Sequence, residues 1–483
     1  MNAETAVAPA YEAVAKGSLA AMASMALNGA MASPNPRSVV SNLPEWAPPP
    51  VEEPTEHLSS EDLRTATTAT AAAPYTATEL RSLSFCAGLA FAIQPGRELG
   101  QVYCRIVELL QEGRWKAHRS VRPNSQLILA GAQAGKLDWR RLGFGAGCVP
   151  LVNYYRGFER LTQKVPMVQS LRHYAEETGL KISQFLPASY LFFPAKPELS
   201  EFQLLAEDHE RRRQVCGERG CWILKSSNGA KGEGIVISED IEHVLNFLQS
   251  KPSTAGPWVA QEYLERPLLL SGGRKFDIRS WVFLAHDFRI YLFSDSVVRT
   301  CSVPWSLDNL GDRFSHLSNH CVQEQCEAYG SHESPINLIN FKRFAQMFDE
   351  GQLQIRSGTG FSAAVPPKCF NELIFPQIEE MIRDTLLALR ETLELPENSR
   401  YSSMQAFGYD FMIDADFTVK LLEVNATPAL SEDLLEEFVR DMKVVGIERY
   451  MAEQNGNPDL AAAIVEEHQS PQPGRNTLYQ IYP

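Results

Sequence analysis

The stretch Phe407-Gly-Tyr-Asp-Phe-Met-Ile-Asp-Ala-Asp-Phe-Thr-Val-Lys-Leu-Leu-Glu-Val-Asn425 is the part of this chain from which the fold can be worked out. Two apolar runs flank the acidic turn Asp414-Ala-Asp416, a pattern typical of a β-hairpin. On the second predicted strand, Glu423 and Asn425 are two residues apart, so both side chains should point to the same face of the strand. The stretch therefore predicts a hairpin with one polar face.

Asp410 lies on the first predicted strand, close enough across the pair for its carboxylate to join Glu423 and Asn425. Leu422 and Val424 should point to the opposite face. Two carboxylates and an amide oxygen form an all-oxygen set that suits Mg²⁺. The stretch alone leaves a second interpretation open, a hairpin whose polar face is simply solvated.

Length and charge limit the kinds of protein that this chain can be. Its 483 residues, 44% of them hydrophobic, are enough for two or three domains. The net charge of −14 argues against a protein that binds nucleic acid or anionic membranes. The sequence contains no apolar run of about 18 residues, as a transmembrane helix would need, and its N-terminus is a poor signal peptide. We therefore expect a cytoplasmic protein.

Cysteine and histidine usage gives little support for a metal or disulfide framework. The nine cysteines are an odd number and are spread along the chain, which favours a reducing compartment. A metal site remains a minor alternative at six residues whose spacing is not that of a usual zinc site: Cys216, Cys221, His316, His320, Cys321 and Cys326.

The first third of the chain changes composition near residue 96. Residues 1–95 are rich in Ala, Pro, Thr and Glu and have weak periodicity, so they predict a disordered extension. Residues 97–164 carry twelve Lys or Arg against five Asp or Glu, and we expect a small basic α/β domain over 96–165. This basic face is either solvated or a dock for an acidic partner. Six cations dominate it: Arg114, Lys116, Arg119, Arg122, Arg140 and Arg141.

A strand, a glycine-rich loop and a second strand are predicted between Cys221 and Ser238. The loop Ser226–Gly234 contains three glycines and Lys231. Glycines let the backbone approach phosphate oxygens, so the segment is typical of a hairpin that covers phosphates. It lacks the Gly-Lys-Ser/Thr ending of a P-loop, and by itself it indicates nucleotide binding only weakly.

The segments on either side of this hairpin differ in character. Residues 196–218 are polar and charged, and we expect a mobile surface connection there. Residues 258–264 predict a short strand whose edge offers backbone donors and acceptors to an adenine.

A charged strand is predicted over residues 273–284, where Lys275, Asp277 and Arg279 share one face. Three charges are costly if they are buried without partners, so we expect them to line a wet cleft that holds a charged ligand. A plain surface strand is the alternative. Arg299, on a following strand, offers another planar cation.

In this order, the segments resemble the ATP-grasp ligases and, within them, the tubulin tyrosine ligase family. The resemblance spans about residues 97–450. Six stretches carry it: Leu151-Val-Asn-Tyr-Tyr-Arg-Gly157, Trp222-Ile-Leu-Lys-Ser-Ser-Asn-Gly-Ala-Lys-Gly-Glu-Gly-Ile235, Arg274-Lys-Phe-Asp-Ile-Arg-Ser-Trp281, His316-Leu-Ser-Asn-His-Cys321, Gly408-Tyr-Asp-Phe-Met-Ile-Asp414 and Leu422-Glu-Val-Asn425. It implies an α/β (α+β) ATP-grasp fold, with a central domain over 166–305 and a C-terminal domain over 306–450. A flexible tail would follow over 451–483.

The form Lys225-Ser-Ser is similar to the tyrosine-adding branch of the family, since glutamate- and glycine-adding relatives usually have Lys-Pro there. The resemblance therefore implies an ATP- and Mg²⁺-dependent ligase that adds free tyrosine to the C-terminal glutamate of detyrosinated α-tubulin through an acyl phosphate. Its expected form is a cytoplasmic, cytoskeleton-associated monomer. Two alternatives stay open: a tubulin glutamate or glycine ligase, and a tubulin-binding protein without catalysis. Gln163 departs from the family, which has a basic residue there, and residues 1–95 have no counterpart.

The resemblance also implies roles for particular residues. Those that act in catalysis are Arg279, Arg299, Glu423 and Lys225. Those that contact the nucleotide are Lys164, Lys225, Lys231, Gly232, Gln261, Glu262, Tyr263, Leu264, Lys275, Asp277 and Asp410. Those that hold Mg²⁺ are Asp410, Glu423 and Asn425. Arg156 would contact ATP or the acidic tail, and the basic segment would dock tubulin.

Overall fold

The predicted hairpin is present as strands β16 (Gln405–Ile413) and β17 (Val419–Asn425), which pair antiparallel. Among the described strands, its sheet has the order β12-β11-β10-β16-β17, with β18 also paired to β11. Every residue of β16 is buried, which requires cover on both faces of the sheet. The remaining strands of this sheet are β10 (Phe276–Leu284), β11 (Ile290–Thr300), β12 (Leu338–Asn340) and β18 (Leu478–Tyr482).

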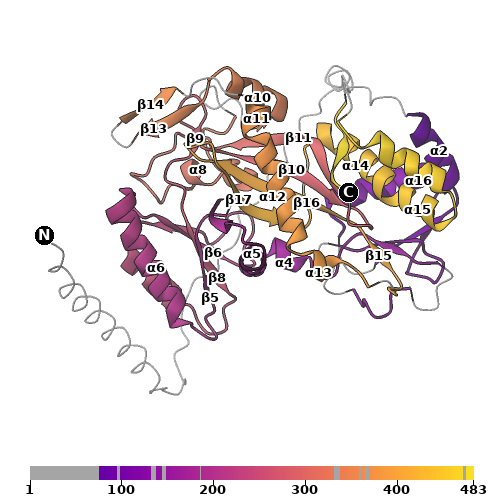
Figure 1. The fold of residues 1–483 in the computed structure, drawn as a ribbon, viewed down its shortest axis with the longest axis horizontal. Helices are drawn as coiled ribbons and strands as arrows, with labels where there is room; N and C mark the ends of the chain where they lie inside the picture. Colours follow the sequence, from indigo (N-terminus) through magenta and orange to yellow (C-terminus); the bar gives the residue numbers. More distant parts are fainter. Residues whose placement is uncertain are drawn as a thin grey trace, which may run out of the picture. The chain divides into compact units, whose positions relative to one another are not determined.

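The fold is that of a computed structural model, drawn in Figure 1, in which all described residues belong to one unit. It describes residues 76–94, 98–131, 137–143, 148–184, 186–330, 338–357, 360–364, 369–396, 398–471 and 475–483. Helices and several sheets alternate along the chain, so the expected mixed α/β class is confirmed. In these described parts, no helix combines the length and the apolar character that crossing a membrane requires.

A second sheet carries the predicted phosphate hairpin. Its order is β5-β8-β6-β7, and β6 (Trp222–Ser226) pairs antiparallel with β7 (Val236–Ser238) around the glycine-rich loop. The strand expected as an adenine edge is β8 (Trp258–Glu262), the central neighbour of β6. The strand–loop–strand prediction is therefore confirmed. The sheet is completed by β5 (Ser189–Phe192), and α7 (Ile241–Gln249) packs against β7.

The prediction of a mobile connection over residues 196–218 is wrong. Helix α6 (Leu199–Arg211) occupies most of this segment and continues into a π-helical turn, η4 (Arg212–Cys216). Leu205 and His209 are buried on one side of α6, four residues apart. Because the buried face of α6 contains so few apolar residues, the sequence pattern did not predict this helix.

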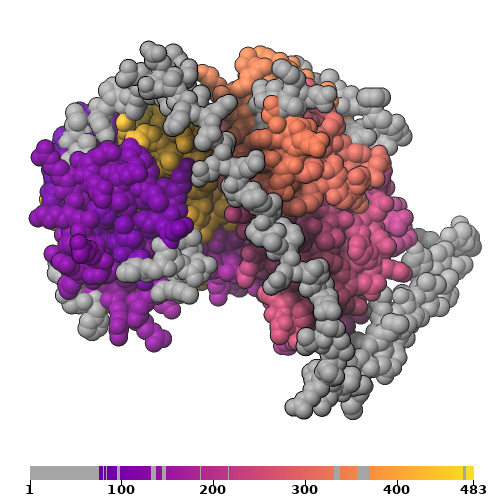
Figure 2. Space-filling view, turned by 180° about the vertical axis from the view of Figure 1, so that it is seen from behind, coloured from indigo at the N-terminus to yellow at the C-terminus, as the bar shows by residue number. Residues whose placement is uncertain are grey.

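A third, parallel sheet contains the N-terminal strands in the order β15-β4-β3-β1-β2. The described residues of the N-terminal part gather on one side of the molecule in the space-filling view, in indigo (Figure 2). The strands are β1 (Ala90–Ile93), β2 (Lys116–His118), β3 (Leu127–Leu129), β4 (Leu151–Val152) and β15 (Ser402–Ser403), with helix α3 (Gln101–Glu112) between β1 and β2. Because β15 comes from the C-terminal half, this layer is not built from residues 96–165 alone.

The folded part begins earlier than the predicted boundary at residue 95. Helix α2 (Ala77–Cys86) starts with a capping box between Thr76 and Glu79. It packs against α15 (Arg449–Gln454), α16 (Pro458–Glu467) and η5 (Lys443–Glu448), and β1 follows it. Residues 1–75, for which we expect disorder, lie outside the described residues.

The predicted flexible tail is also wrong in large part. Helix α14 (Glu432–Met442) continues through η5 (Lys443–Glu448) and α15 (Arg449–Gln454), and α16 (Pro458–Glu467) follows. Strand β18 then returns to pair with β11, where Leu478 and Tyr479 are buried. The order Leu-Tyr-Gln-Ile-Tyr in this strand does not alternate between apolar and polar residues, so the sequence pattern missed it.

The remaining described elements connect these layers. The helices are α4 (Glu159–Thr162), α5 (Lys164–Thr178), η3 (Ile182–Gln184), α8 (Arg313–His316), α9 (His320–Gln323), α10 (Phe341–Asp349), α11 (Phe370–Leu373), α12 (Phe375–Leu387) and α13 (Arg390–Leu393). A small sheet has the order β14-β13-β9, from β9 (Leu268–Leu269), β13 (Gln354–Ser357) and β14 (Gly360–Ala364).

Candidate active site

A cleft is lined by residues of the two sheets that contain β8 and β16. The predicted site residues that line it are Lys164, Lys225, Lys231, Gly232, Gln261, Glu262, Tyr263, Leu264, Lys275, Asp277, Arg299, Asp410 and Glu423. Arg279 and Asn425 lie behind these, where both contact Asp410. Arg156 is exposed outside the lining. The tertiary structure thus gathers most of the predicted residues at one place.

Asp410 and Glu423 are directly opposite each other on β16 and β17. The register then shifts, so that Phe411 pairs with Leu421 and Leu422 has no partner of its own. This bulge turns Leu422 towards the cleft, which it lines beside Glu423. The prediction that Leu422 points away from Glu423 is therefore wrong.

The Asp410 carboxylate lies between two guanidinium groups. Arg279 binds both of its oxygens, with Nη2 2.8 Å from Oδ2, and Nη2 of Arg299 is 2.9 Å from the same Oδ2. Burial alone would raise the pKa of Asp410, but Arg279 and Arg299 outweigh burial and hold that pKa at about 2. Asp410 therefore stays ionised at neutral pH.

Asp277 binds Arg299 in a fork, with both N–O distances 2.7 Å. Ser318 also donates its hydroxyl to Asp277. Arg299 thus joins Asp277 on β10 to Asp410 on β16, and the charges predicted to line a cleft are paired rather than isolated.

Two lysines approach the cleft with few anionic partners. Nζ of Lys225 donates to the side-chain oxygen of Gln261 at 2.8 Å. Nζ of Lys275 donates to the Tyr263 hydroxyl and to the His316 carbonyl oxygen, both at 3.1 Å. Burial lowers the pKa of both lysines to about 8. Ammonium groups held this way favour an incoming anion such as phosphate.

The glycine-rich loop needs unusual backbone angles. Lys231, Gly232 and Gly234 have φ of 56°, 71° and 66°, all in the left-handed region. Arg313 donates to the Gly232 carbonyl at 3.1 Å, and Lys164 donates to the Gly229 carbonyl at 2.8 Å. The loop is therefore attached to both sides of the cleft.

The stretch after β8 is held by buried polar groups. The Tyr263 hydroxyl accepts from Trp305 at 2.9 Å and contacts Nδ1 of His316 at 2.6 Å. Nε2 of His316 is 3.0 Å from the Asn309 carbonyl, so the ring binds at both nitrogens. Burial and Lys275 lower the pKa of His316 to about 4, which keeps the ring neutral. His316 thus faces the cleft in a structural role.

The donor set at the hairpin fits Mg²⁺. Asp410, Glu423 and Asn425 supply two carboxylates and an amide, and Mg²⁺ commonly takes one or two carboxylates and completes its shell with phosphate and water. The Glu423 carboxylate is 27% exposed, with Nζ of Lys164 3.4 Å away, so it can accept a cation from the cleft. Within the described residues, no three His, Cys, Asp or Glu side chains form a metal site, so a Cys/His site gains no support.

Sequence reasoning missed several residues that hold this site. Arg212 contacts Glu262, and Ser318 contacts Asp277. Ser318 lies in a stretch that carries the family resemblance, so that stretch was a usable signal. Arg212 lies in the run Arg211-Arg212-Arg213. It differs from its two neighbours in being buried, which the sequence does not show.

Comparison with known proteins identifies the family to which the chain is similar. The model of the tubulin-tyrosine ligase family matches residues 146–437, more than half of the chain. Tubulin glycylase 3B of Tetrahymena thermophila is 27% identical over 259 residues, covering 52% of this chain and 20% of the relative. Human tubulin monoglycylase TTLL3 is 30% identical over 224 residues, covering 44% of this chain and 26% of the relative. Human probable tubulin polyglutamylase TTLL2 is 24% identical over 302 residues, covering 61% of this chain and 45% of the relative. The chain thus spans less than half the length of these relatives.

Proposed function

Because the chain belongs to the tubulin-tyrosine ligase family, which fits the expected ATP-grasp fold, we propose that it is an ATP-dependent ligase that attaches glycine to side chains of tubulin. The expectation of tyrosine as the added amino acid has less support, because similar relatives are named as glycylases. The Lys225-Ser-Ser form that favoured tyrosine is one short stretch, and it weighs less than similarity over more than two hundred residues.

One structural observation carries the proposal. The cleft brings the glycine-rich loop, the lysines Lys225 and Lys275, and the carboxylates Asp410 and Glu423 to one place. Cations and carboxylates gathered in one cleft are what a nucleotide triphosphate and its metal ion need. A protein that only bound tubulin would have no use for this combination.

The proposed reaction couples amide formation to phosphoryl transfer. A tubulin carboxylate oxygen attacks the γ-phosphorus of ATP, and ADP leaves. The glycine amine then attacks the acyl carbon, phosphate leaves with the former carboxylate oxygen, and the amine gives up a proton. No protein nucleophile takes part, so the protein supplies positioning and charge.

We assign the residues as follows. Lys225, Lys275 and the backbone of the Ser226–Gly234 loop hold the phosphates, with Lys231 and Lys164 at its edge. The stretch Gln261–Leu264 holds the adenine. Arg279 and Arg299 stabilise the transferring phosphoryl group and the acyl phosphate. Asp410, Glu423 and Asn425 would hold Mg²⁺, which when bound neutralises phosphate charge.

A basic surface for the acidic partner belongs to the same proposal. Arg114, Lys116, Arg119, Arg122, Arg140 and Arg141 are all exposed. Such a surface attracts an acidic protein over a distance of about 8–10 Å at physiological salt. We propose that this face docks tubulin, and that the enzyme is a cytoplasmic monomer associated with the cytoskeleton.

Glutamate is the second candidate amino acid, favoured by the similarity to a probable tubulin polyglutamylase, which covers 61% of this chain. One experiment separates the candidates. The purified chain is incubated with tubulin, ATP, Mg²⁺ and equal amounts of glycine, glutamate and tyrosine, and the tubulin is analysed by peptide mass spectrometry. Added glycine supports the first proposal and added glutamate the second. Added tyrosine alone, or no addition with any of the three, would overturn the proposal.

A further inference from the structure

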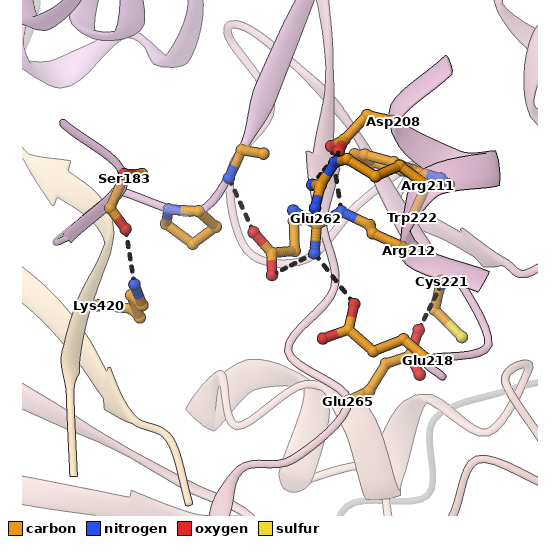
Figure 3. A network of polar contacts seen from close by, with 12 residues as sticks. Ser183, Asp208, Arg211, Arg212, Glu218, Cys221, Trp222, Glu262, Glu265 and Lys420 are labelled. Carbon is orange, nitrogen blue, oxygen red and sulfur yellow. Dashed lines mark hydrogen bonds and ion pairs between the residues drawn. The ribbon is translucent and has the colours of Figure 1, made fainter. Parts of the chain in front are cut away.

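Three consecutive arginines lie at the end of α6, and they differ in solvent exposure. Arg211 and Arg213 are exposed, whereas Arg212 is buried, with 9% of its surface accessible. The turn η4 begins at Arg212. A π-helical turn places side chains differently from an α-helix, is rare, and frequently occurs at functional sites. Here it directs Arg212 back towards the end of β8 (Figure 3).

The Arg212 guanidinium binds carboxylates from three parts of the chain. Nε is 3.0 Å from Oδ2 of Asp208 on α6, and Nη1 is 3.2 Å from Oε2 of Glu218 after the π-turn. The same Nη1 is 2.7 Å from Oε1 of Glu262 at the end of β8. The guanidinium also lies over the ring of Trp222, 5.6 Å from its centre. Figure 3 shows these contacts around Arg212.

Glu262 is held from both sides at the point where β8 enters the cleft. Its Oε2 accepts from the Ala188 amide at 3.0 Å, and its own amide donates to the Ala188 carbonyl at 2.7 Å. Glu262 lines the cleft together with Tyr263 and Leu264, which follow it. The Arg212–Glu262 pair therefore adds a side-chain anchor to the backbone pairing that holds this stretch.

The pair is well matched electrostatically. Burial alone would lower the pKa of Arg212, but Glu262 and Asp208 outweigh burial and raise it above its usual range. A planar fork that binds three carboxylates leaves the side chain little freedom. Lysine, a point charge on a flexible stem, could not satisfy all three in the same geometry.

We propose that Arg212 is a positioning residue for the nucleotide base: through Glu262 it fixes the stretch Glu262–Leu264 against which the adenine lies. This inference rests on the proposed function, because it assumes that the cleft binds ATP. Arg212 does not line the cleft itself, so it acts through Glu262.

The test compares Arg212→Gln with Arg213→Gln, which removes a neighbouring exposed charge from the same turn. We expect Arg212→Gln to raise the KM for ATP about ten-fold and to leave kcat within about two-fold, because the base is misplaced while the phosphate contacts remain. Inhibition by inorganic tripolyphosphate, which has no base, should be unchanged. Arg213→Gln should behave as the wild-type chain does.

A general loss of structure would give a different result. It would weaken the binding of tripolyphosphate and of ATP equally and would lower kcat. That outcome overturns the inference. If Arg212→Gln does not fold, Glu262→Gln provides the test, since it keeps the acceptor for Ala188 and loses the charge facing Arg212. Glu262→Gln should raise the KM for ATP. Arg212→Lys should bind ATP more tightly than Arg212→Gln does, but more weakly than the wild-type chain.

Failure of the inference differs from failure of the proposed function. If the wild-type chain binds no ATP at all, the proposed function is wrong. If the wild-type chain binds ATP and Arg212→Gln and Glu262→Gln both bind it equally well, only the role of Arg212 is wrong.

Discussion

Asp410 and Glu423 face each other across β16 and β17, and each is held by cations from another element. Arg279 and Arg299 bind Asp410, and Lys164 contacts Glu423. The two carboxylates are not equivalent, because Asp410 is 2% exposed and Glu423 is 27% exposed. Glu423 is therefore the carboxylate that can accept an added cation with the smaller rearrangement.

Replacing Glu423 by Gln should remove ligation and leave the fold intact. The change keeps the shape of a partly exposed side chain but removes a charge that would hold Mg²⁺, so we expect kcat to fall on the order of 10²-fold or more. Tubulin binding should be unchanged. Asp416→Asn, in the exposed turn of the same hairpin, is the control. Full activity in Glu423→Gln would disprove the metal assignment.

Two glycines of the phosphate loop should respond differently to alanine. Both have positive φ, which costs a residue with a Cβ about 1–2 kcal/mol. A Cβ at Gly232 would lie 3.0 Å from Val322, whereas one at Gly234 would meet nothing within 4 Å. We expect Gly232→Ala to raise the KM for ATP several-fold more than Gly234→Ala. Equal effects in steady-state kinetics would show that the contact with Val322 is unimportant.

The reaction should lose efficiency as pH rises through about 8. Burial lowers the pKa of Lys225 and Lys275 to about 8 from an unfolded value of about 10.4. The free enzyme therefore loses both charges above pH 8, and kcat/KM for ATP should fall. Lys225→Arg and Lys275→Arg should each make the decline less steep, since a guanidinium stays charged.

The same shifts have the opposite effect on stability. Between about pH 8 and about 10.4 the unfolded chain binds more protons at these lysines than the folded chain, so the unfolding free energy rises with pH there. Denaturant unfolding of the wild-type chain and the two arginine variants across this window checks the sign. A kcat/KM that does not change across the same window would contradict the lowered pKa values.

Reversing Arg140 and Arg141 to Glu should weaken the interaction with tubulin. Both are exposed, so the fold should tolerate the change, although Arg141 loses a contact of 3.3 Å with Asp138. We expect the KM for tubulin to rise and the KM for ATP to stay constant, and wild-type binding to weaken as salt increases. Lys181→Glu, an exposed cation on another segment, is the control. Binding that does not depend on salt would argue against the docking face.

Removing residues 478–483 should destabilise the whole fold. Leu478 and Tyr479 are buried where β18 pairs with β11, and each buried side chain of this size contributes roughly 1.5–3 kcal/mol. We therefore expect a loss of about 3–6 kcal/mol in the unfolding free energy, measured by denaturant titration. Removing only Tyr482 and Pro483, which are not buried, should cost much less. Equal unfolding curves for the wild-type chain and the variant without residues 478–483 would show that β18 is dispensable.

Much of the site was accessible from local sequence pattern. Strand alternation placed Asp277 and Arg279 on one face, and the pattern around the glycine-rich loop predicted the hairpin of β6 and β7. These predictions succeed because side-chain direction within a strand follows from a two-residue period alone. The predicted direction of Leu422 was wrong because a bulge interrupts this two-residue period. Whether a bulge forms depends on the partner strand.

The sequence by itself determined the strands of the two hairpins, the glycine loop, the basic N-terminal segment and the family resemblance, because each depends on residues close together in the chain. Only the tertiary structure decided that Arg299 joins Asp277 to Asp410, and that Arg212, the buried member of three consecutive arginines, reaches Glu262. Glu262 is fifty residues from Arg212 along the chain, and Asp410 more than a hundred from Arg299. Burial and pairing of charges across such separations follow from how the sheets pack, and no local pattern in the sequence records that packing.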